Sequence, residues 1–142
     1  MYDFFIASRY RNKPEVLLLA KKLEEKRKKV YCFIQSDASR KHVGTLEDNA
    51  EEAMKKYEAI ENWREDVRIK EIFETDMHAL RNSEALILLL PAGKSAHMEA
   101  GAAYGMGKKC ILIGEQKETE SLYFIFDETF STIDAFLSSF PS

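Results

Sequence analysis

Short apolar runs alternate with longer helical segments along this 142-residue chain, and the alternation constrains the fold more than any other feature. The most hydrophobic run, Ala85–Leu90, reads Ala-Leu-Ile-Leu-Leu-Leu and contains no polar position. A continuous run of this kind is typical of a strand that is buried on both faces of a parallel sheet. Because such strands alternate here with helical segments, the sequence favours an α/β fold with a mainly parallel sheet.

The other apolar runs predict further strands with helices between them. The strands are expected at Tyr2–Ala7, Val30–Ile34, Lys109–Ile113 and Tyr123–Phe126. The helices are expected from the Asn12 cap and Pro14 onward, over Thr45–Ala59 and Asp66–Asn82, from the Ser95 cap to Met106, and over Thr132–Ser139, with a polar loop at 35–39. The sequence therefore predicts one domain, residues 1–142, with a flavodoxin-like or Rossmann-like sheet of about five mainly parallel strands flanked by about five helices.

The composition is that of an ordinary globular protein, with 45% hydrophobic and 32% charged residues. A net charge of -3 argues against a protein that binds nucleic acid polymers through their phosphates. No stretch approaches the roughly 18 apolar residues of a membrane span, and Met1–Phe4 lacks the basic start of a signal peptide. Cys32 and Cys110 lie in apolar runs, which predicts free core thiols in a reducing cytoplasm rather than a disulfide.

Glu99 is a single carboxylate among small residues, in the helix that follows the most hydrophobic run. Ala96, Ala102 and Ala103 share its helix face, and an acid on a buried face is costly unless something uses it. Glu99 lies one residue too late for a capping box, but we expect it in the first turn, where the helix dipole favours the ionised form. An ionised carboxylate beyond the carboxyl ends of parallel strands is suited to nucleophilic catalysis, with a structural role as the alternative.

Asp76 is a second candidate, in the helix before the central strand. Its neighbours on the helix are apolar or small, although a surface carboxylate would fit the local sequence equally well. The apolar or small neighbours of Asp76 are Ile72, Phe73, Ala79 and Leu80.

The segment after the first strand contains Arg9, Tyr10, Arg11 and Lys13. Its three cations either neutralise a phosphate or belong to a solvated loop. His97 either lines the site or packs, and the three histidines lack the spacing of metal ligands.

Two familiar site types are excluded. Gly93-Lys94-Ser95 matches the end of a phosphate-binding Walker motif, but the glycine required five places earlier is replaced by Leu88. A receiver domain needs an acidic pair after the first strand and an aspartate at the end of the third. The chain has Ser8-Arg9-Tyr10 and Leu90-Pro91 at those places.

The chain resembles the nucleoside 2-deoxyribosyltransferases and the related nucleoside 5'-monophosphate N-glycosidases over most of its length. Three segments carry the resemblance. They are Phe4–Ser8, Asp76–Leu80 and Gly93–Gly101, the last followed by Gly107-Lys108 before a strand. The family often has a tyrosine early in the first strand, near the nucleophile. This chain has Phe4 and Phe5 there, and Tyr10 lies further along.

The resemblance implies the roles of individual residues. Glu99 corresponds to the nucleophile, and Asp76 to the aspartate linked to proton handling at the base or to sugar positioning. The substrate is expected to be bound by Ser8, Arg9, Tyr10, Gly93, Ser95 and His97. The resemblance also implies a homo-oligomer, small nucleosides or nucleotides as substrates, and no metal or cofactor.

These residues and the resemblance together predict one chemistry. Glu99 attacks the anomeric carbon and forms a covalent glycosyl-enzyme, while Asp76 protonates or holds the departing base. A second base accepts the sugar in a transferase, and water accepts it in a hydrolase. A hydrolase of nucleoside monophosphates is favoured if Arg9 or Arg11 binds a phosphate. A non-catalytic nucleotide-binding or signalling module is the alternative from a different class.

Overall fold

A five-stranded parallel sheet forms the centre of the molecule, with the strand order β2-β1-β3-β4-β5. The computed structural model describes residues 1–44 and 49–141. The strands are β1 (Tyr2–Ala7), β2 (Val30–Cys32), β3 (Ser83–Leu89), β4 (Lys109–Ile113) and β5 (Glu128–Phe130). The expected single α/β domain with a flavodoxin-like or Rossmann-like sheet is confirmed, and the most hydrophobic run is its central strand.

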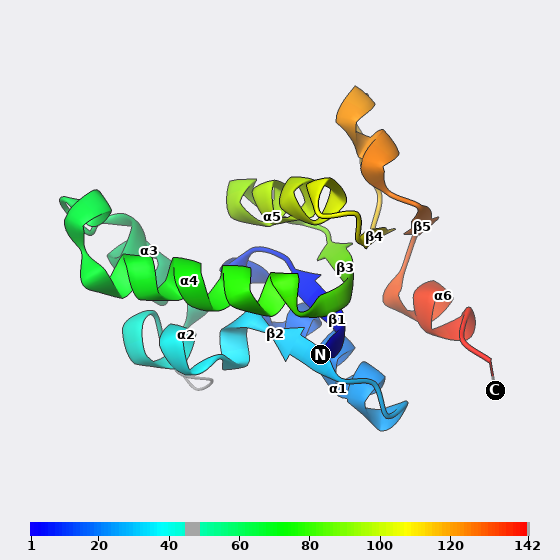
Figure 1. Cartoon of the computed structure of the whole chain (residues 1–142), viewed down its shortest axis with the longest axis horizontal. Coiled ribbons are helices and arrows are strands. Elements are labelled where there is room, and N and C mark those ends of the chain that lie inside the picture. The colour runs from blue at the N-terminus through cyan, green and yellow to red at the C-terminus, as the bar shows by residue number, and fades with distance from the viewer. Residues whose placement is uncertain (45–48, 142) are drawn as a thin grey trace.

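Helices cover both faces of this sheet (Figure 1). They are α1 (Lys13–Glu25), α2 (Asp37–His42), α3 (Ala50–Glu58), α4 (Val67–Arg81), α5 (Lys94–Gly105) and α6 (Ile133–Ser138). The apolar stripes of α1 and α6 pack on one face, against the side chains of Ile6 and Ile87. The helices α4 and α5 pack on the other face, against Phe5 and Leu86. Alternate residues of each strand thus point to opposite cores, as the strand geometry requires.

The expected polar loop at 35–39 is wrong, because most of it belongs to α2. Ser36 is the N-cap, and its hydroxyl accepts a hydrogen bond from the backbone N–H of Ser39 at 3.1 Å. Asp37 in the first turn forms an ion pair with Arg40 at 2.8 Å. The strand β2 is shorter than expected, since the chain turns into a 3₁₀ helix at 33–35. The expected helix start at 45–48 lies outside the described residues, and α3 is described from Ala50.

The fifth strand lies later in the chain than the apolar run Tyr123–Phe126 suggested. That run falls in and just after a 3₁₀ helix, η4 (Ser121–Ile125), in which Phe124 is 92% exposed. The carboxylate of Glu120 accepts a hydrogen bond from the N–H of Leu122 at 3.1 Å and caps the turn. Pairing with β4 begins instead at Glu128. Hydrophobicity therefore indicated the region of the fifth strand but not its residues. A strand also has to reach the free edge of β4, and residues 128–130 do so.

The helices on either side of the central strand begin with different caps. In α4 the carboxylate of Asp66 accepts a hydrogen bond from the N–H of Arg68 at 2.9 Å. The helix ends at Arg81, and Asn82, the expected last residue, is its C-cap. In α5 the N-cap is Gly93, so the expected Ser95 cap is wrong: Ser95 is already the second helical residue. The left-handed backbone of Gly107, with φ of 77°, follows the end of α5.

The two cysteines, Cys32 and Cys110, are buried free thiols, as expected. Among the residues that the structure describes, no helix is both long and apolar enough to cross a membrane.

Candidate active site

Two carboxyl groups lie on neighbouring helices over one face of the sheet. Asp76 lies in the middle of α4, beside Ala79 and Leu80, which are buried against the sheet. Glu99 lies on α5, whose buried residues Ala96, Ala100 and Ala103 face the same core. Both carboxyl-bearing residues are half-buried. The small alanines let α5 approach the sheet closely, so the Glu99 carboxyl is held low in the layer rather than in solvent.

The two carboxyl groups interact electrostatically. Burial and, to a smaller extent, the nearby charge of Asp76 together raise the pKa of Glu99 to about 8. Burial also raises the pKa of Asp76, to about 6, while a hydrogen bond from Tyr31 opposes that rise. At pH 7 Asp76 is therefore mainly ionised and Glu99 mainly protonated. The pair carries one proton at neutral pH.

The expected help from the helix dipole is wrong for Glu99. Because α5 begins at Lys94, Glu99 is its sixth residue and lies beyond the first turn. The dipole acts chiefly within that turn, so it does not offset the cost of burial. Glu99 therefore rests as a neutral acid, and an attack by its carboxylate needs a partner that takes the proton first.

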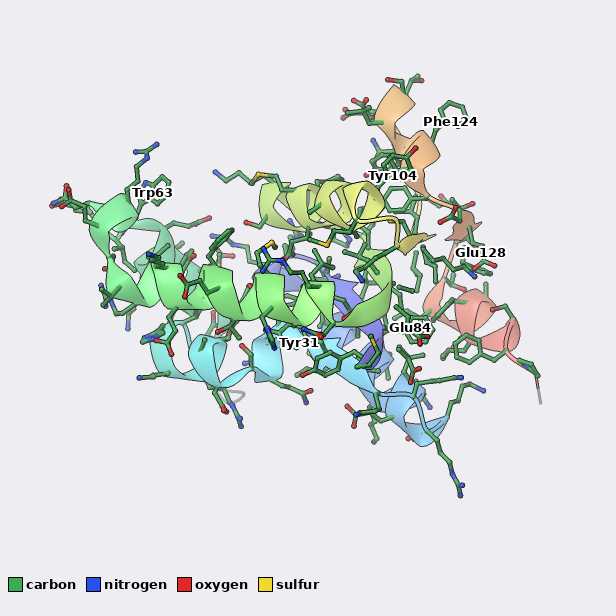
Figure 2. The ribbon with its side chains drawn as sticks, viewed as in Figure 1. Tyr31, Trp63, Glu84, Tyr104, Phe124 and Glu128 are labelled. Carbon is green, nitrogen blue, oxygen red and sulfur yellow. The ribbon has the colours of Figure 1, made fainter. Side chains whose placement is uncertain are left out.

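Tyr31 is the residue of this site that the sequence analysis missed. Its hydroxyl donates a hydrogen bond to Oδ1 of Asp76 at 2.7 Å, and Figure 2 shows its side chain next to α4. The register of the sheet pairs Tyr31 with Phe5 of the neighbouring strand β1. The only local signal was one polar aromatic in the apolar run of the second strand. Tyr57 on α3 is also close enough for the charge of Asp76 to raise its pKa.

Two expected binding residues have hydroxyl groups engaged by the fold. Ser8 is 6% exposed, and its hydroxyl donates to the carbonyl of Leu89 at 2.8 Å and accepts from Nδ2 of Asn12 at 3.2 Å. Tyr10 is buried in the core on the α1 face, and its hydroxyl donates to the carbonyl of Gly44 at 3.3 Å. Ser8 thus joins the end of β1 to the end of β3. Tyr10 is not placed beside the carboxyl pair by these contacts.

The cations after β1 have different environments. Arg11 binds Glu51 at 2.6 Å and Glu58 at 2.9 Å, and so ties this loop to α3. Arg9 is exposed and makes no ion pair within residues 1–44 and 49–141. A Cβ added to Gly93 would lie 3.9 Å from the Cβ of Arg9, so Arg9 stands beside the start of α5. Ser95, in the first turn of α5, is exposed.

His97 connects the start of α5 to η4. One ring nitrogen, Nδ1, lies 2.7 Å from the carbonyl oxygen of Gly93, and the other, Nε2, lies 2.7 Å from the hydroxyl of Tyr123. Because the carbonyl can only accept, Nδ1 carries the hydrogen, and in the neutral ring Nε2 accepts from the phenol. The two rings also stack, with centroids 5.8 Å apart. His97 therefore joins the first turn of α5 to η4.

A cavity of 310 Å³ opens at the carboxyl ends of β3 and β4, on the face covered by α1 and α6. Leu89, Ile113, Gly114 and Glu15 are among the residues that line it. Asp76 and Glu99 are not part of it, since they belong to the α4–α5 face. The chemistry of the carboxyl pair identifies the candidate site more directly than the volume of this cavity.

No protein-family model matches the chain, and no curated protein matches it. The fold and the side chains define an α/β domain with two half-buried carboxyl groups that interact electrostatically.

Proposed function

We propose that this protein cleaves the N-glycosidic bond of (deoxy)nucleosides through a covalent intermediate on Glu99 and transfers the 2-deoxyribosyl group to another base. The observation that carries this proposal is the carboxyl pair of Asp76 and Glu99. Within the described parts of the chain neither group forms an ion pair. Two buried carboxyl groups without a cation destabilise a fold, and such pairs are typical of catalytic sites. The resemblance to nucleoside 2-deoxyribosyltransferases supports the same assignment.

The single proton of the pair suits the chemistry of this reaction. As substrate binds, the proton moves from Glu99 to Asp76, directly or over one water. The Glu99 carboxylate then attacks the anomeric carbon and forms an ester bond, while the electrons of the broken carbon–nitrogen bond pass to the base. Asp76 gives its proton to the departing base. In the second step an incoming base attacks the anomeric carbon, and the ester bond to Glu99 breaks and returns its electrons to the Glu99 carboxylate. Asp76 takes the proton of the incoming base, and the two displacements retain the configuration overall.

A chromatographic assay of base exchange tests the proposal. The purified protein is incubated with deoxynucleosides and deoxynucleoside monophosphates, each with and without a second free base. We expect exchange that needs the second base and disappears in Glu99→Gln. Glu74→Gln is the matched control, because Glu74 lies on α4 but is exposed and pairs with Lys70 at 3.9 Å. Binding of nucleotides without turnover, in both the wild type and Glu99→Gln, would contradict the enzyme and favour a nucleotide-binding or signalling module.

Hydrolysis of nucleoside 5'-monophosphates is the second candidate, and Arg9 favours it. The Cβ of Arg9 lies beside Gly93, the N-cap of α5, and Arg9 makes no ion pair within residues 1–44 and 49–141, whereas Arg11 is engaged by two glutamates. A guanidinium at a helix N-terminus is suited to a phosphate. The hydrolase is supported if base is released from monophosphates without an acceptor. The KM for the monophosphate is then expected to rise at least tenfold in Arg9→Gln and to stay unchanged in Arg11→Gln. Equal use of nucleosides and monophosphates by Arg9→Gln and wild type supports the transferase.

The proposal also includes the setting of the enzyme. We place it in the cytoplasm, where the buried thiols of Cys32 and Cys110 stay reduced, and give it small nucleosides or nucleotides as substrates. We also propose that it works as a homo-oligomer.

A further inference from the structure

We propose that Tyr31 is a positioning residue for Asp76: it fixes the carboxylate in one orientation and keeps it the unprotonated member of the carboxyl pair before substrate binds. The inference rests on the proposed function, since it describes how the same site is prepared. It assigns a role to a strand, β2, from which the sequence analysis took no site residue.

Tyr31 is itself held firmly. It is 7% exposed, and its ring stacks on Phe5 with centroids 5.0 Å apart and an angle of 23° between the planes. Tyr2 packs against it edge-on at 5.5 Å. Parallel pairing of β1 with β2 fixes the backbone of both rings. The phenol therefore offers its hydroxyl from a rigid base, which is what a positioning group requires.

The hydrogen bond between the two side chains has a definite direction. Burial and the charge of Asp76 raise the pKa of Tyr31 well above its usual range, so the phenol keeps its hydrogen and donates it. Ser36, at the start of α2, also interacts with this hydroxyl. With Oδ1 of Asp76 occupied at 2.7 Å, Oδ2 is the oxygen left for substrate or for a proton. A donor of this kind favours the ionised form of a carboxyl group.

The carboxyl group of Glu99 differs from that of Asp76 in its hydrogen bonding. Within residues 1–44 and 49–141 no side chain donates a hydrogen bond to its carboxyl group. The other titratable groups around Asp76 are Tyr57 from α3 and Glu99 itself from α5, while His42 of α2 binds Glu71. This asymmetry between the two carboxyl groups directs the proton to Glu99. Asp76 is thereby ready to receive it.

The variant Tyr31→Phe removes the hydroxyl and keeps the ring that stacks on Phe5. Carbon-13 NMR follows the titration of the Asp76 carboxyl without substrate, with Asp76→Asn identifying the signal. We expect the midpoint to rise by about one pH unit, as the loss of one hydrogen bond to a carboxylate implies. Tyr2→Phe is the matched control, because it removes a neighbouring hydroxyl that makes no hydrogen bond within the described residues, and it leaves the midpoint unchanged.

Kinetics provide the second measurement. Asp76 must be ionised to take the proton from Glu99, so the acidic limb of the kcat/KM profile moves up with the NMR midpoint in Tyr31→Phe. An unchanged midpoint, or a shift of the basic limb alone, would overturn the proposal. If no substrate is turned over, the proposed function fails while the NMR titration still decides the role of Tyr31. If Tyr31→Phe does not fold, Asp76→Asn provides the reverse test: the Tyr31 phenol then titrates at a lower pH than in the wild type, and an unchanged phenol titration contradicts the contact.

Discussion

The folded protein holds Glu99 in an environment that disfavours its ionised form. Its pKa is about 8 in the folded protein, compared with 4.5 for the ordinary group, so the folded state binds more protons than the unfolded state between these values. The free energy of unfolding therefore decreases as the pH rises through this window. A carboxyl group retained at such a position makes better sense as part of a working site than as part of the scaffold.

The first prediction follows from this sign. Glu99→Gln keeps the shape of the side chain and removes the charge, so it is expected to be more stable than the wild type at pH about 9. A rise of the pKa from 4.5 to about 8 corresponds to on the order of 5 kcal/mol. The difference disappears below the ordinary pKa of 4.5, where both side chains are neutral. Urea unfolding across this pH range measures it. Glu74→Gln, on the solvent side of α4, gives no alkaline gain, and equal stability of Glu99→Gln and wild type at alkaline pH would contradict the burial argument.

The second prediction concerns the coupling between the two carboxyl groups. Asp76→Asn removes the charge that raises the pKa of Glu99, so this pKa is expected to fall from about 8. It stays above 4.5, because burial is the larger cause. Carbon-13 NMR titration of the glutamate carboxyl groups follows the change. Glu71→Gln is the control, since Glu71 lies on the same helix but binds His42 at the surface. If the pKa of Glu99 is the same in Asp76→Asn and in the wild type, the two carboxyl groups do not interact.

Glu99 and Asp76 were accessible to sequence analysis, but Tyr31 was not. Glu99 lies among alanines and Asp76 among apolar neighbours, and in both cases the pattern spans only three or four residues on either side. The contact of Tyr31 with Asp76 joins residues 45 positions apart and exists only because β2 lies next to β1 under α4. Strand order and helix packing are long-range properties, and one sequence leaves them open. The same limit explains why the hydroxyls of Ser8 and Tyr10 were not recognised as part of the fold.

At the scale of elements, hydrophobic runs located the strands well where they are central and poorly at the edge. Residues 85–89 of the central strand β3 and 110–113 of the neighbouring β4 are buried and apolar, so their runs are continuous. The edge strand β5 has only three residues, and the more apolar run before it became η4. A short edge strand buries little, so its pattern is weak. The starts of α2 and η4 are set by local hydrogen bonds rather than by hydrophobicity: the side chains of Ser36 and Glu120 accept from backbone N–H groups there.

The third prediction tests how η4 is held to α5. Tyr123→Phe keeps the ring that stacks on His97 and removes the hydrogen bond to Nε2. Backbone amides of η4 are expected to exchange with deuterium about fivefold faster, as the loss of one hydrogen bond of about 1 kcal/mol implies. Tyr104→Phe is the control, because Tyr104 is 58% exposed and makes no hydrogen bond among the described residues. Unchanged exchange in η4 would mean that the stacked rings alone hold the segment.

At the scale of the whole molecule, four of the ten large apolar side chains that are exposed among the described residues lie on η4 and at the end of α5. Leu122 and Phe124 are 71% and 92% exposed on η4, and Tyr104 and Met106 are 58% and 39% exposed at the end of α5. Figure 2 shows Phe124 projecting from its segment, with Tyr104 on the neighbouring α5. Large apolar groups held in water on a rigid, capped turn are typical of an interaction surface. A second copy of the chain is the partner that the proposed homo-oligomer requires.

The fourth prediction is that this protein self-associates through η4 and the end of α5. Phe124 becomes buried when two copies associate, and burial of a phenylalanine side chain contributes about 1.5–3 kcal/mol. Phe124→Ser is therefore expected to weaken self-association at least tenfold. Sedimentation velocity over a range of concentrations measures the change. Trp63→Ser is the matched control, because Trp63 is 51% exposed but lies at the opposite end of the molecule (Figure 2). A wild type that stays monomeric at every concentration would contradict the homo-oligomer, and a larger effect of Trp63→Ser would place the interface at the end formed by α3 and the start of α4. If Phe124→Ser also leaves the titration of Glu99 unchanged, the carboxyl pair is complete within one copy, because its environment then does not depend on the partner.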